Sequence, residues 1–402
     1  MALAVSFDDV QAAADTIGGA VYPTPTTHAQ TLSDISGADI WVKWENQQFT
    51  GSFKERGARN FLSHLDNEAR PKGVIAASAG NHAQGVAYHA ALLSIPATIV
   101  MPADTPFTKV TNTAHHGARI ELVGDSYATA FEHAEAMAAQ TGATLVPAFD
   151  DPLVIAGQGT VGIELIAAMP DPDLIVVPVG GGGLIAGIAI AAKELAPRAR
   201  VVGVQAEGYP AMLHAFGQAP AVPGGSTIAE GIAVTEPGVL TRAVVAALVD
   251  DIVVASEQRI EQAVALYVEI EKTVVEGAGA AALAAVLEHP EMFSGKTVAV
   301  IVSGGNIDAR VLASVLSRAL ARSGRLVRLR IDVPDRPGAL AAVASVIAEQ
   351  RGNIVDVEHR RDLPGVAVKN VRVEMSVETR DRAHADEMVR ALESAGYGVE
   401  VV

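Results

Sequence analysis

The chain contains no cysteine, and only 4% of its residues are aromatic. The lack of cysteine excludes disulfides, zinc–thiolate sites, iron–sulfur clusters and a cysteine nucleophile. Hydrophobic residues make up 50% of the chain, and because aromatic residues are scarce, most of them are alanine, valine, leucine and isoleucine. This composition is typical of an α/β protein and excludes disordered and collagen-like chains.

Positive charge is also scarce. The chain has 30 basic and 46 acidic residues, which give a net charge of −16. Nucleic-acid binding needs basic patches that neutralise phosphates, so we expect no nucleic-acid partner. The segment from Met1 to Asp9 lacks the basic and apolar regions of a signal peptide. The expected location is therefore the cytoplasm.

One stretch without charge has nearly the length of a membrane span. It runs from Leu174 to Ala192. Pro178 and the glycines 180–183 would break a helix in the middle of this stretch. The stretch instead predicts a buried strand at Leu174–Val179, a glycine loop and a helix that begins near Leu184. We therefore expect no membrane contact.

The density of charged residues indicates a domain boundary. Residues 325–402 contain 25 charged side chains in 78 positions, about twice the density of the preceding 324 residues. A small domain buries a smaller fraction of its surface and needs more charge. We therefore expect a first domain at 1–322, a linker within Arg318–Arg325 and a second domain at 326–402.

The pattern of the second domain predicts the element order βαββαβ of a ferredoxin-like fold. A turn at Asp335-Arg336-Pro337-Gly338 follows the first strand. No nucleophile, metal cluster or carboxylate pair is evident, so this domain is expected to bind a ligand. The expected elements are the strand Leu326–Val333, the helix Ala339–Glu349, the strands Asn353–Arg360 and Val366–Val377, the helix Arg382–Ala395 and the strand Gly398–Val402.

Residues 70–320 alternate short apolar runs with alanine-rich helical stretches, which predicts parallel sheets with crossover helices. In such folds, functional loops leave the carboxyl ends of strands. Three loops are candidates: residues 78–82, the glycines after Leu174–Val179, and residues 303–306. We expect each to join a strand to a helix N-terminus, where free N–H groups attract anions. The expected strands are Val74–Ala77, Thr98–Met101, Arg119–Val123, Leu174–Val179, Val201–Ala206 and Thr297–Val302.

The glycine loop also allows a different interpretation. Residues 181–186 satisfy the pattern G-x-G-x-x-A, and Glu207 follows about twenty residues later. This pattern is typical of NAD-binding folds. However, the motif lies in the middle of the chain and leaves the other two loops without a role, so a nicotinamide enzyme is the weaker hypothesis.

Four segments together carry a more specific signal. They are Ser52-Phe53-Lys54-Glu55-Arg56-Gly57-Ala58, Ser78-Ala79-Gly80-Asn81-His82, Gly180-Gly181-Gly182-Gly183-Leu184 and Ser303-Gly304-Gly305-Asn306. In this order and spacing they resemble the fold-type II pyridoxal-phosphate enzymes, and more narrowly the threonine dehydratase (threonine ammonia-lyase) family. The resemblance covers roughly residues 5–320. Residues 335–340 and 352–354 resemble an ACT domain.

The resemblance implies a tryptophan synthase β-like fold with two subdomains, each with an open sheet, and a role for each motif. Lys54 would hold pyridoxal 5'-phosphate as a Schiff base and act as a base. Asn81 would bind the phenolic oxygen of the cofactor, and Ser303 would face its pyridine nitrogen. Phe53 would pack against the cofactor ring or in the core. The phosphate would be held by the N–H groups of Gly180, Gly181, Gly182, Gly183 and Leu184.

The implied reaction is deamination of L-threonine to 2-oxobutanoate, and of L-serine to pyruvate. The substrate carboxylate would be bound by Ser78, Ala79, Gly80, Asn81 and His82. A hydroxyl at Ser303 cannot stabilise a pyridinium, which favours β-elimination over transamination. Serine racemases share most of these motifs but have a serine where this chain has Ala79. The alternatives are therefore a serine dehydratase or racemase of the same fold, or a non-catalytic amino-acid sensor.

The ACT resemblance implies allosteric regulation by an amino acid, for which isoleucine or valine would be natural effectors, and a homodimer or homotetramer. A role in isoleucine biosynthesis is one possibility, and a degradative role is another. Relatives sometimes bind a cation near segments that here contain Glu207, Glu230 and Glu276, but helix packing explains Glu276 equally well. We expect no metal site.

Overall fold

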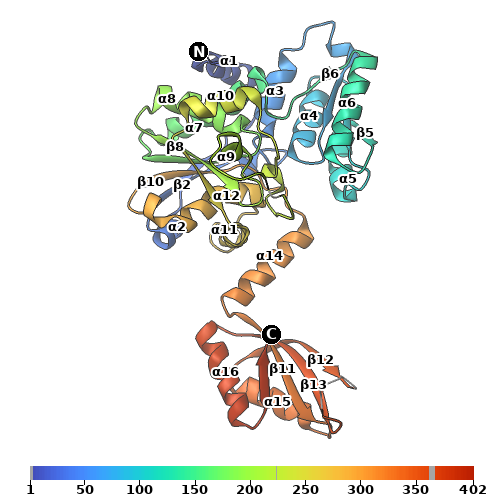
Figure 1. The fold of residues 1–402 in the computed structure, drawn as a ribbon, viewed down its shortest axis with the longest axis vertical. Coiled ribbons are helices and arrows are strands. Elements are labelled where there is room, and N and C mark those ends of the chain that lie inside the picture. Colours follow the sequence, from blue (N-terminus) through green and yellow to red (C-terminus); the bar gives the residue numbers. More distant parts are fainter. Residues whose placement is uncertain (1–2, 223, 362–366) are drawn as a thin grey trace. The chain divides into compact units, whose positions relative to one another are not determined.

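The computed structural model describes residues 3–222, 224–361 and 367–402. The chain forms two compact units, Met1–Asp308 and Ala309–Val402 (Figure 1). The second unit begins at the start of α14 (Ala309–Arg322), whereas the charge density led us to expect the boundary after this helix. Hydrogen bonds from Thr379 to Gly324 O and from Arg382 to Arg322 O attach the end of α14 to the second unit.

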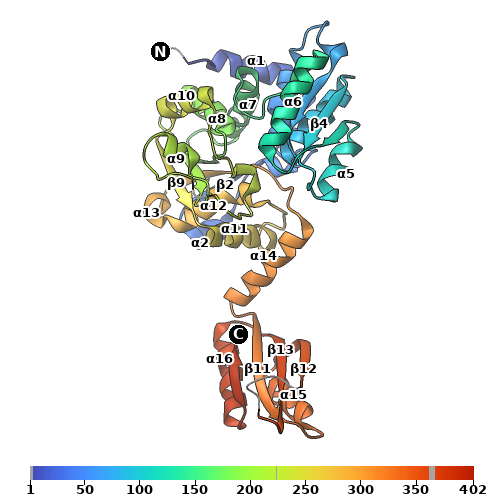
Figure 2. The same cartoon turned by 45° about the vertical axis from the view of Figure 1, so that its right-hand side comes forward.

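The larger sheet of the first unit has six strands. Their order is β1 (Thr26–His28), β2 (Asp39–Trp44), β10 (Thr297–Val302), β7 (Leu174–Pro178), β8 (Arg200–Ala206) and β9 (Asp251–Ala255). Only the pair of β1 and β2 is antiparallel. Helices cover both faces of this sheet, as Figures 1 and 2 show: on one side α7 (Pro152–Ala168), α8 (Gly183–Leu195) and α10 (Val239–Leu248), and on the other α11 (Glu257–Glu269) and α12 (Gly277–Glu288).

The smaller sheet of the first unit is wholly parallel. Its order is β5 (Arg119–Leu122), β4 (Ala97–Met101), β3 (Val74–Ala77) and β6 (Thr144–Leu145). It packs with α4 (Asn81–Leu92), α5 (Phe107–His115) and α6 (Tyr127–Thr141). The two open sheets confirm the expected two-subdomain α/β fold.

The remaining elements of the first unit are short or connect the subdomains. They are the helices α1 (Phe7–Ile17), α2 (Gln30–Ser36), α3 (Lys54–Ser63), α9 (Ala211–Ala215) and α13 (Pro290–Phe293), and the 3₁₀ turns η1 (Glu45–Gln47), η2 (Arg70–Lys72) and η3 (Glu230–Ile232).

The second unit contains the expected βαββαβ order. Its four antiparallel strands are arranged as β12 (Asn353–Arg360), β13 (Asn370–Glu378), β11 (Leu326–Pro334) and β14 (Gly398–Val401). The helices α15 (Ala339–Glu349) and α16 (Arg382–Ser394) pack on this sheet. Val366, where we expected a strand to begin, lies outside the described residues.

The six strands expected in residues 70–320 are all present, to within one residue at either end. The third loop joins β10 to α14 as expected, but α14 begins only at Ala309 and belongs to the second unit. The glycines of this loop allow close packing: a Cβ on Gly304 would lie 2.5 Å from Glu276 Oε1. Within the described ranges, none of the helices has both the length and the apolar character that crossing a bilayer requires.

Candidate active site

Lys54 is the first residue of α3, immediately after a loop that leaves β2. Its Nζ donates a hydrogen bond to Ala148 O at 2.7 Å and lies 5.2 Å from the centre of the Phe53 ring. Burial lowers the pKa of Lys54 to about 8, and the negative charge of Glu276 opposes this shift. The amine is therefore partly neutral near pH 8, as a nucleophile or base requires.

The glycine loop lies beside this lysine, because the segment that follows β6 touches both. Ala148 accepts the hydrogen bond from Lys54, and the ring of the next residue, Phe149, lies where a Cβ on Gly181 would come within 2.4 Å. The loop turns through Gly182, whose φ of +96° is a conformation that side chains rarely adopt. It ends at the N-terminus of α8.

The backbone N–H groups of this loop are free. Among the described residues, none of the amides from Gly180 to Leu184 donates a hydrogen bond to a protein acceptor. Unpaired amides at a helix N-terminus form a site for an anion, and they are reinforced by the helix dipole. The loop can therefore hold a phosphate group without any basic side chain.

Ser303 and Asn81 complete the group of predicted residues. The Phe53 N–H donates to Ser303 O at 3.1 Å, which places Ser303 beside the start of α3. The Ser303 side chain is almost fully buried, and within the described ranges its hydroxyl has no hydrogen-bond partner. Asn81 Nδ2 donates to Glu276 Oε1 at 2.7 Å, and Asn81 Oδ1 accepts from Asn306 Nδ2 at 2.7 Å.

The loop between β3 and α4 retains three of its five expected amide donors. The N–H of Ser78 donates to Val100 O and that of Gly80 donates to Ser78 Oγ, so the expectation that these two amides are available is wrong. The amides of Ala79, Asn81 and His82 have no acceptor among the described residues. They lie at the N-terminus of α4, where a carboxylate is stabilised.

The His82 side chain is buried and bonds to the backbone of the segment that follows β6. Its Nε2 is 3.0 Å from Val146 O, a carbonyl that can only accept, so Nε2 carries the hydrogen. Burial, reinforced by the positive charge of Lys54, lowers the pKa of His82 to about 3. The ring therefore stays neutral at physiological pH and fixes the start of α4 against the segment that follows β6.

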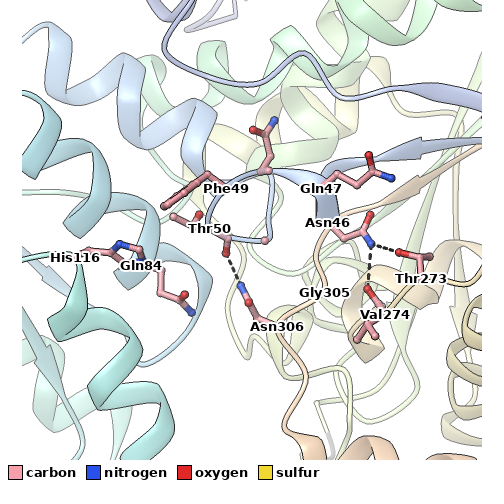
Figure 3. Close-up of a pocket in the computed structure, with 12 residues that line it drawn as sticks. Asn46, Gln47, Phe49, Thr50, Gln84, His116, Thr273, Val274, Gly305 and Asn306 are labelled. Atoms are coloured by element: carbon pink, nitrogen blue, oxygen red, sulfur yellow. Dashed lines mark hydrogen bonds between the residues drawn. The ribbon is translucent and has the colours of Figure 1, made fainter.

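A polar pocket of about 410 Å³ opens beside the site (Figure 3). It is formed by the segment from Asn46 to Gly51 together with residues from α4, the residue that follows α5, and the segments before α12 and after β10. In Figure 3, Asn306 Nδ2 donates to Thr50 O, and Asn46 Nδ2 donates to Thr273 Oγ1 and Val274 O. The other lining residues are Gln47, Gln48, Phe49, Gly51, Gln84, His116 and Gly305.

Sequence reasoning did not identify several residues that hold the site together. Glu276 and Asn306 contact Asn81 from segments 195 and 225 residues away in the chain. Arg56, two residues after Lys54, is fully buried and bonds to Glu45 and Glu164. The available signal for such residues was a charged side chain in a segment that is otherwise expected to be buried. The sequence does not show which residue each of these side chains contacts.

The three glutamates near which relatives sometimes bind a cation do not gather into one cluster in the described part of the chain, although burial and the nearby charge of Glu230 both raise the pKa of Glu276. Glu207 accepts from Glu257 N–H, Glu230 pairs with Lys109 at 2.6 Å, and Glu276 binds Asn81. Among the described residues, no group of three or more histidine, aspartate or glutamate side chains could hold a metal ion. The packing interpretation of the segment after Glu276 is supported, since a Cβ on Gly279 would lie 2.4 Å from Gly304 O.

This fold and this arrangement of lysine, glycine loop, asparagine and serine define a cofactor-dependent enzyme of the two-subdomain α/β class. Residues 17–304 match the family model described as pyridoxal-phosphate dependent enzyme, and residues 327–396 match that of the ACT domain. The chain belongs to the pyridoxal-phosphate-dependent enzyme family and carries a C-terminal ACT domain. The predicted family membership is thus confirmed.

The chain is similar to known ammonia-lyases and racemases. The L-threonine ammonia-lyase of Thermotoga maritima is 43% identical over 400 residues, which cover 99% of this chain and 100% of the relative. Among solved structures, the processed threonine deaminase isoform 2 of Solanum lycopersicum superposes with a TM-score of 0.73 at 35% identity, over 78% of this chain and 92% of that one. Maize serine racemase superposes with a TM-score of 0.74 at 36% identity, over 79% and 99%.

The residues present fit pyridoxal phosphate. The free amides from Gly180 to Leu184 suit a phosphate, and the unpartnered hydroxyl of Ser303 suits a neutral ring nitrogen. The partly neutral amine of Lys54 suits an aldehyde. Among the described residues, the loop amides and the Ser303 hydroxyl have no protein partner, Lys54 donates to Ala148 O, and the amide of Asn81 is bonded to Glu276 and Asn306.

Proposed function

We propose that this chain is a pyridoxal-phosphate-dependent ammonia-lyase that converts L-threonine to 2-oxobutanoate and ammonia, and L-serine to pyruvate and ammonia. The observation that carries the proposal is the convergence of Lys54, the free amides of the glycine loop, Asn81 and Ser303 in one site. The full-length similarity to an L-threonine ammonia-lyase supports threonine as the main substrate.

The bound cofactor would supply an electron sink that stabilises negative charge at the substrate Cα. Lys54 would hold the cofactor, Asn81 would bind its phenolic oxygen, the amides of residues 180–184 would bind its phosphate, and Phe53 would support its ring. Ser303 would offer the ring nitrogen a hydroxyl, which is too weak an acid to protonate it. The electron sink would then be moderate, which would favour loss of the β-hydroxyl over transamination.

The chain's own residues position the substrate and move its proton. The amides of Ala79, Asn81 and His82 bind the substrate carboxylate at the N-terminus of α4. Once the substrate amine has taken its place on the cofactor, the freed Lys54 Nζ would remove the Cα proton, which is within the range of an amine with a pKa of about 8. The electron pair left at Cα would form the Cα=Cβ bond as the Cβ–O bond breaks, and the hydroxide would leave as water, with the proton lost from Cα balancing the one it gains. Addition of one water to the resulting unsaturated amine would release ammonia and the 2-oxo acid.

The ACT domain is proposed to sense an amino acid. Its turn at Asp335-Arg336-Pro337-Gly338 leads directly into α15, where an amino-acid carboxylate can meet free amides. Isoleucine and valine are the candidate effectors, and a homodimer or homotetramer is the proposed assembly. We also propose that the enzyme acts in the cytoplasm.

The decisive experiment measures ammonia release from a panel of amino acids by wild type and Lys54→Ala, each with added pyridoxal phosphate. We expect threonine to be the best substrate and Lys54→Ala to lose at least a factor of about 1,000 in rate together with the visible absorbance of the lysine-bound cofactor. Isoleucine and valine are then added to wild type. A wild-type protein that takes up no cofactor, or a variant with unchanged rate, would refute the proposal.

A further inference from the structure

The side-chain amide of Asn81 lies in a chain of hydrogen bonds with a fixed direction. At one end, Asn306 Nδ2 donates to Thr50 O at 2.7 Å and to Asn81 Oδ1 at 2.7 Å. At the other end, Asn81 Nδ2 donates to Glu276 Oε1 at 2.7 Å. The four residues come from the loop before α3, the segment after β10, the start of α4 and the residue that precedes α12.

The direction follows from the chemistry of the two ends. A backbone carbonyl accepts hydrogen bonds but cannot donate them, so Thr50 O requires the NH₂ group of Asn306. The same NH₂ group also donates to Asn81 Oδ1, which turns the NH₂ group of Asn81 toward Glu276. Above its pKa of about 7, where Glu276 is ionised, its carboxylate can only accept and requires the same arrangement. Oxygen and nitrogen of an amide are ordinarily assigned from such networks, and here both ends give the same assignment.

The position of Glu276 is closely constrained. Its side chain is 9% exposed and also accepts from the Asn306 backbone N–H. A Cβ on Gly304 would lie 2.5 Å from Glu276 Oε1 and 3.1 Å from Asn81 Nδ2, so only glycine leaves room for this contact. The charged groups that act on Glu276 are Glu230 of η3, Lys109 of α5 and, from α3, Lys54.

One hydrogen on Asn81 Nδ2 has no acceptor among the residues that the structure describes. Each of the two hydrogens on Asn306 Nδ2 has a partner there, whereas Asn81 Nδ2 uses only one of its two, on Glu276. If the amide were turned over, its oxygen would face Glu276 and repel the carboxylate. The contacts therefore leave Asn81 with a donor, and not an acceptor, available for a ligand in the site.

We propose that Glu276 and Asn306 are positioning residues that orient the Asn81 amide so that it presents an N–H to the phenolic oxygen of bound pyridoxal phosphate. This inference rests on the proposed function. It assigns a role to two residues that contact the cofactor-binding side chain from distant segments, and it predicts that the polarity of each residue matters more than its size.

The test compares cofactor affinity in two pairs of variants. Apoprotein is titrated with pyridoxal phosphate, and the dissociation constant is read from the visible absorbance. Glu276→Gln keeps an acceptor and should bind nearly as well as wild type, whereas Glu276→Ala should bind roughly tenfold more weakly or worse. Asn306→Ala removes the hydrogen bond that Asn306 donates to Asn81 Oδ1. Asn306→Asp forces the amide to turn over, so it should bind several-fold more weakly than Asn306→Ala.

Gln11→Glu is the control for added charge. Gln11 is an exposed residue of α1 that neither lines the pocket nor takes part in the chain of hydrogen bonds. We expect the affinity of this variant to stay within about threefold of wild type, since an exposed charge is screened. Thermal unfolding of each apoprotein verifies that the variants are folded.

The results separate two kinds of failure. A wild-type protein that develops no visible absorbance would overturn the proposed function, and this inference with it. If wild type binds the cofactor but Glu276→Gln is as weak as Glu276→Ala, the positioning role of Glu276 is refuted. If Asn306→Asp binds as well as Asn306→Ala, the polarity argument is refuted.

Discussion

The amine of Lys54 donates to the carbonyl oxygen of Ala148 at 2.7 Å. This contact fixes the amine next to the glycine loop, since Phe149, the neighbour of Ala148, packs against Gly181. A carbonyl can accept a hydrogen bond from either the charged or the neutral amine. The protonation state of the Lys54 amine therefore depends on its burial and on the charge of Glu276.

The first prediction concerns the pH dependence of cofactor capture by the apoprotein. Only the neutral amine attacks an aldehyde, and burial lowers the pKa of Lys54 to about 8. The capture rate should rise with pH and level off above about pH 8. In Glu276→Gln the midpoint should move to lower pH, because the charge of Glu276 raises the pKa of Lys54. Stopped-flow absorbance across a pH series measures both profiles, and coincident midpoints would contradict the role of Glu276.

The second prediction concerns the stability of the apoprotein. Burial raises the pKa of Glu276 from its usual value of 4.5 to about 7. The folded state therefore binds more protons than the unfolded state between these values, and stability is lost as the pH rises through this window. Glu276→Gln avoids that cost, so its stability relative to wild type should increase by up to ~3 kcal/mol between pH 5 and pH 8.

Urea unfolding at a series of pH values measures this difference. Glu236→Gln, at an exposed position, reports the effect of losing one surface charge. A stability difference between Glu276→Gln and wild type that does not change with pH would show that the carboxyl of Glu276 does not titrate in this window.

The parts of the fold that could be predicted are those with a simple local pattern. The strands β3 and β7 are uninterrupted apolar runs followed by glycine or serine, so their limits are evident in the sequence. The strand β2 was not predicted, because Lys43 interrupts its apolar pattern, although that lysine is fully buried against Glu164 and Glu45. Local patterns cannot identify partners that are distant in sequence.

The same distinction applies to the site. Lys54, Asn81, Ser303 and the glycine loop were expected because each belongs to a short motif. Glu276 was expected only as a residue of helix packing or a cation site, because its contact with Asn81 spans 195 residues. Likewise, no local pattern shows that the Ser78 amide is taken by Val100 O of the adjacent strand.

The third prediction concerns Ala79, which is half-buried between β3 and α4. The resemblance to serine racemases implies that a serine here would place a hydroxyl on the side of the substrate opposite Lys54. Wild type should form little D-serine from L-serine, because a methyl group cannot return a proton. Ala79→Ser should produce measurable D-serine. Chiral chromatography measures the product, and comparable racemisation by wild type would show that another group donates the proton.

The fourth prediction concerns the buried ions behind Lys54. Arg56 bonds to Glu45 through Nε and Nη2, both at 2.8 Å, and to Glu164 through Nη1 at 2.6 Å. Arg56 and Glu45 have no exposed surface. These bonds join α3 to η1 and α7, and thereby fix the helix that carries Lys54.

Arg56→Met removes the guanidinium and leaves the buried charge of Glu45 with Lys43, at 3.9 Å, as its remaining positive partner among the described residues. We expect a loss of ~3–5 kcal/mol in the free energy of unfolding, the cost of an uncompensated buried charge. Arg198→Met, which breaks the exposed pair with Asp171, should change it by less than ~1 kcal/mol. Urea unfolding of the apoprotein measures both.

The double variant Arg56→Met with Glu45→Gln separates the cost of charge from that of packing. If the unpaired charge of Glu45 causes most of the loss, removing that charge should restore part of the stability, even though the hydrogen bonds of Arg56 are still missing. A double variant that is less stable than Arg56→Met would instead assign the loss to the missing hydrogen bonds and packing of the guanidinium. Cofactor affinity should follow stability across this series, because Arg56 acts on the site only by holding α3 in place.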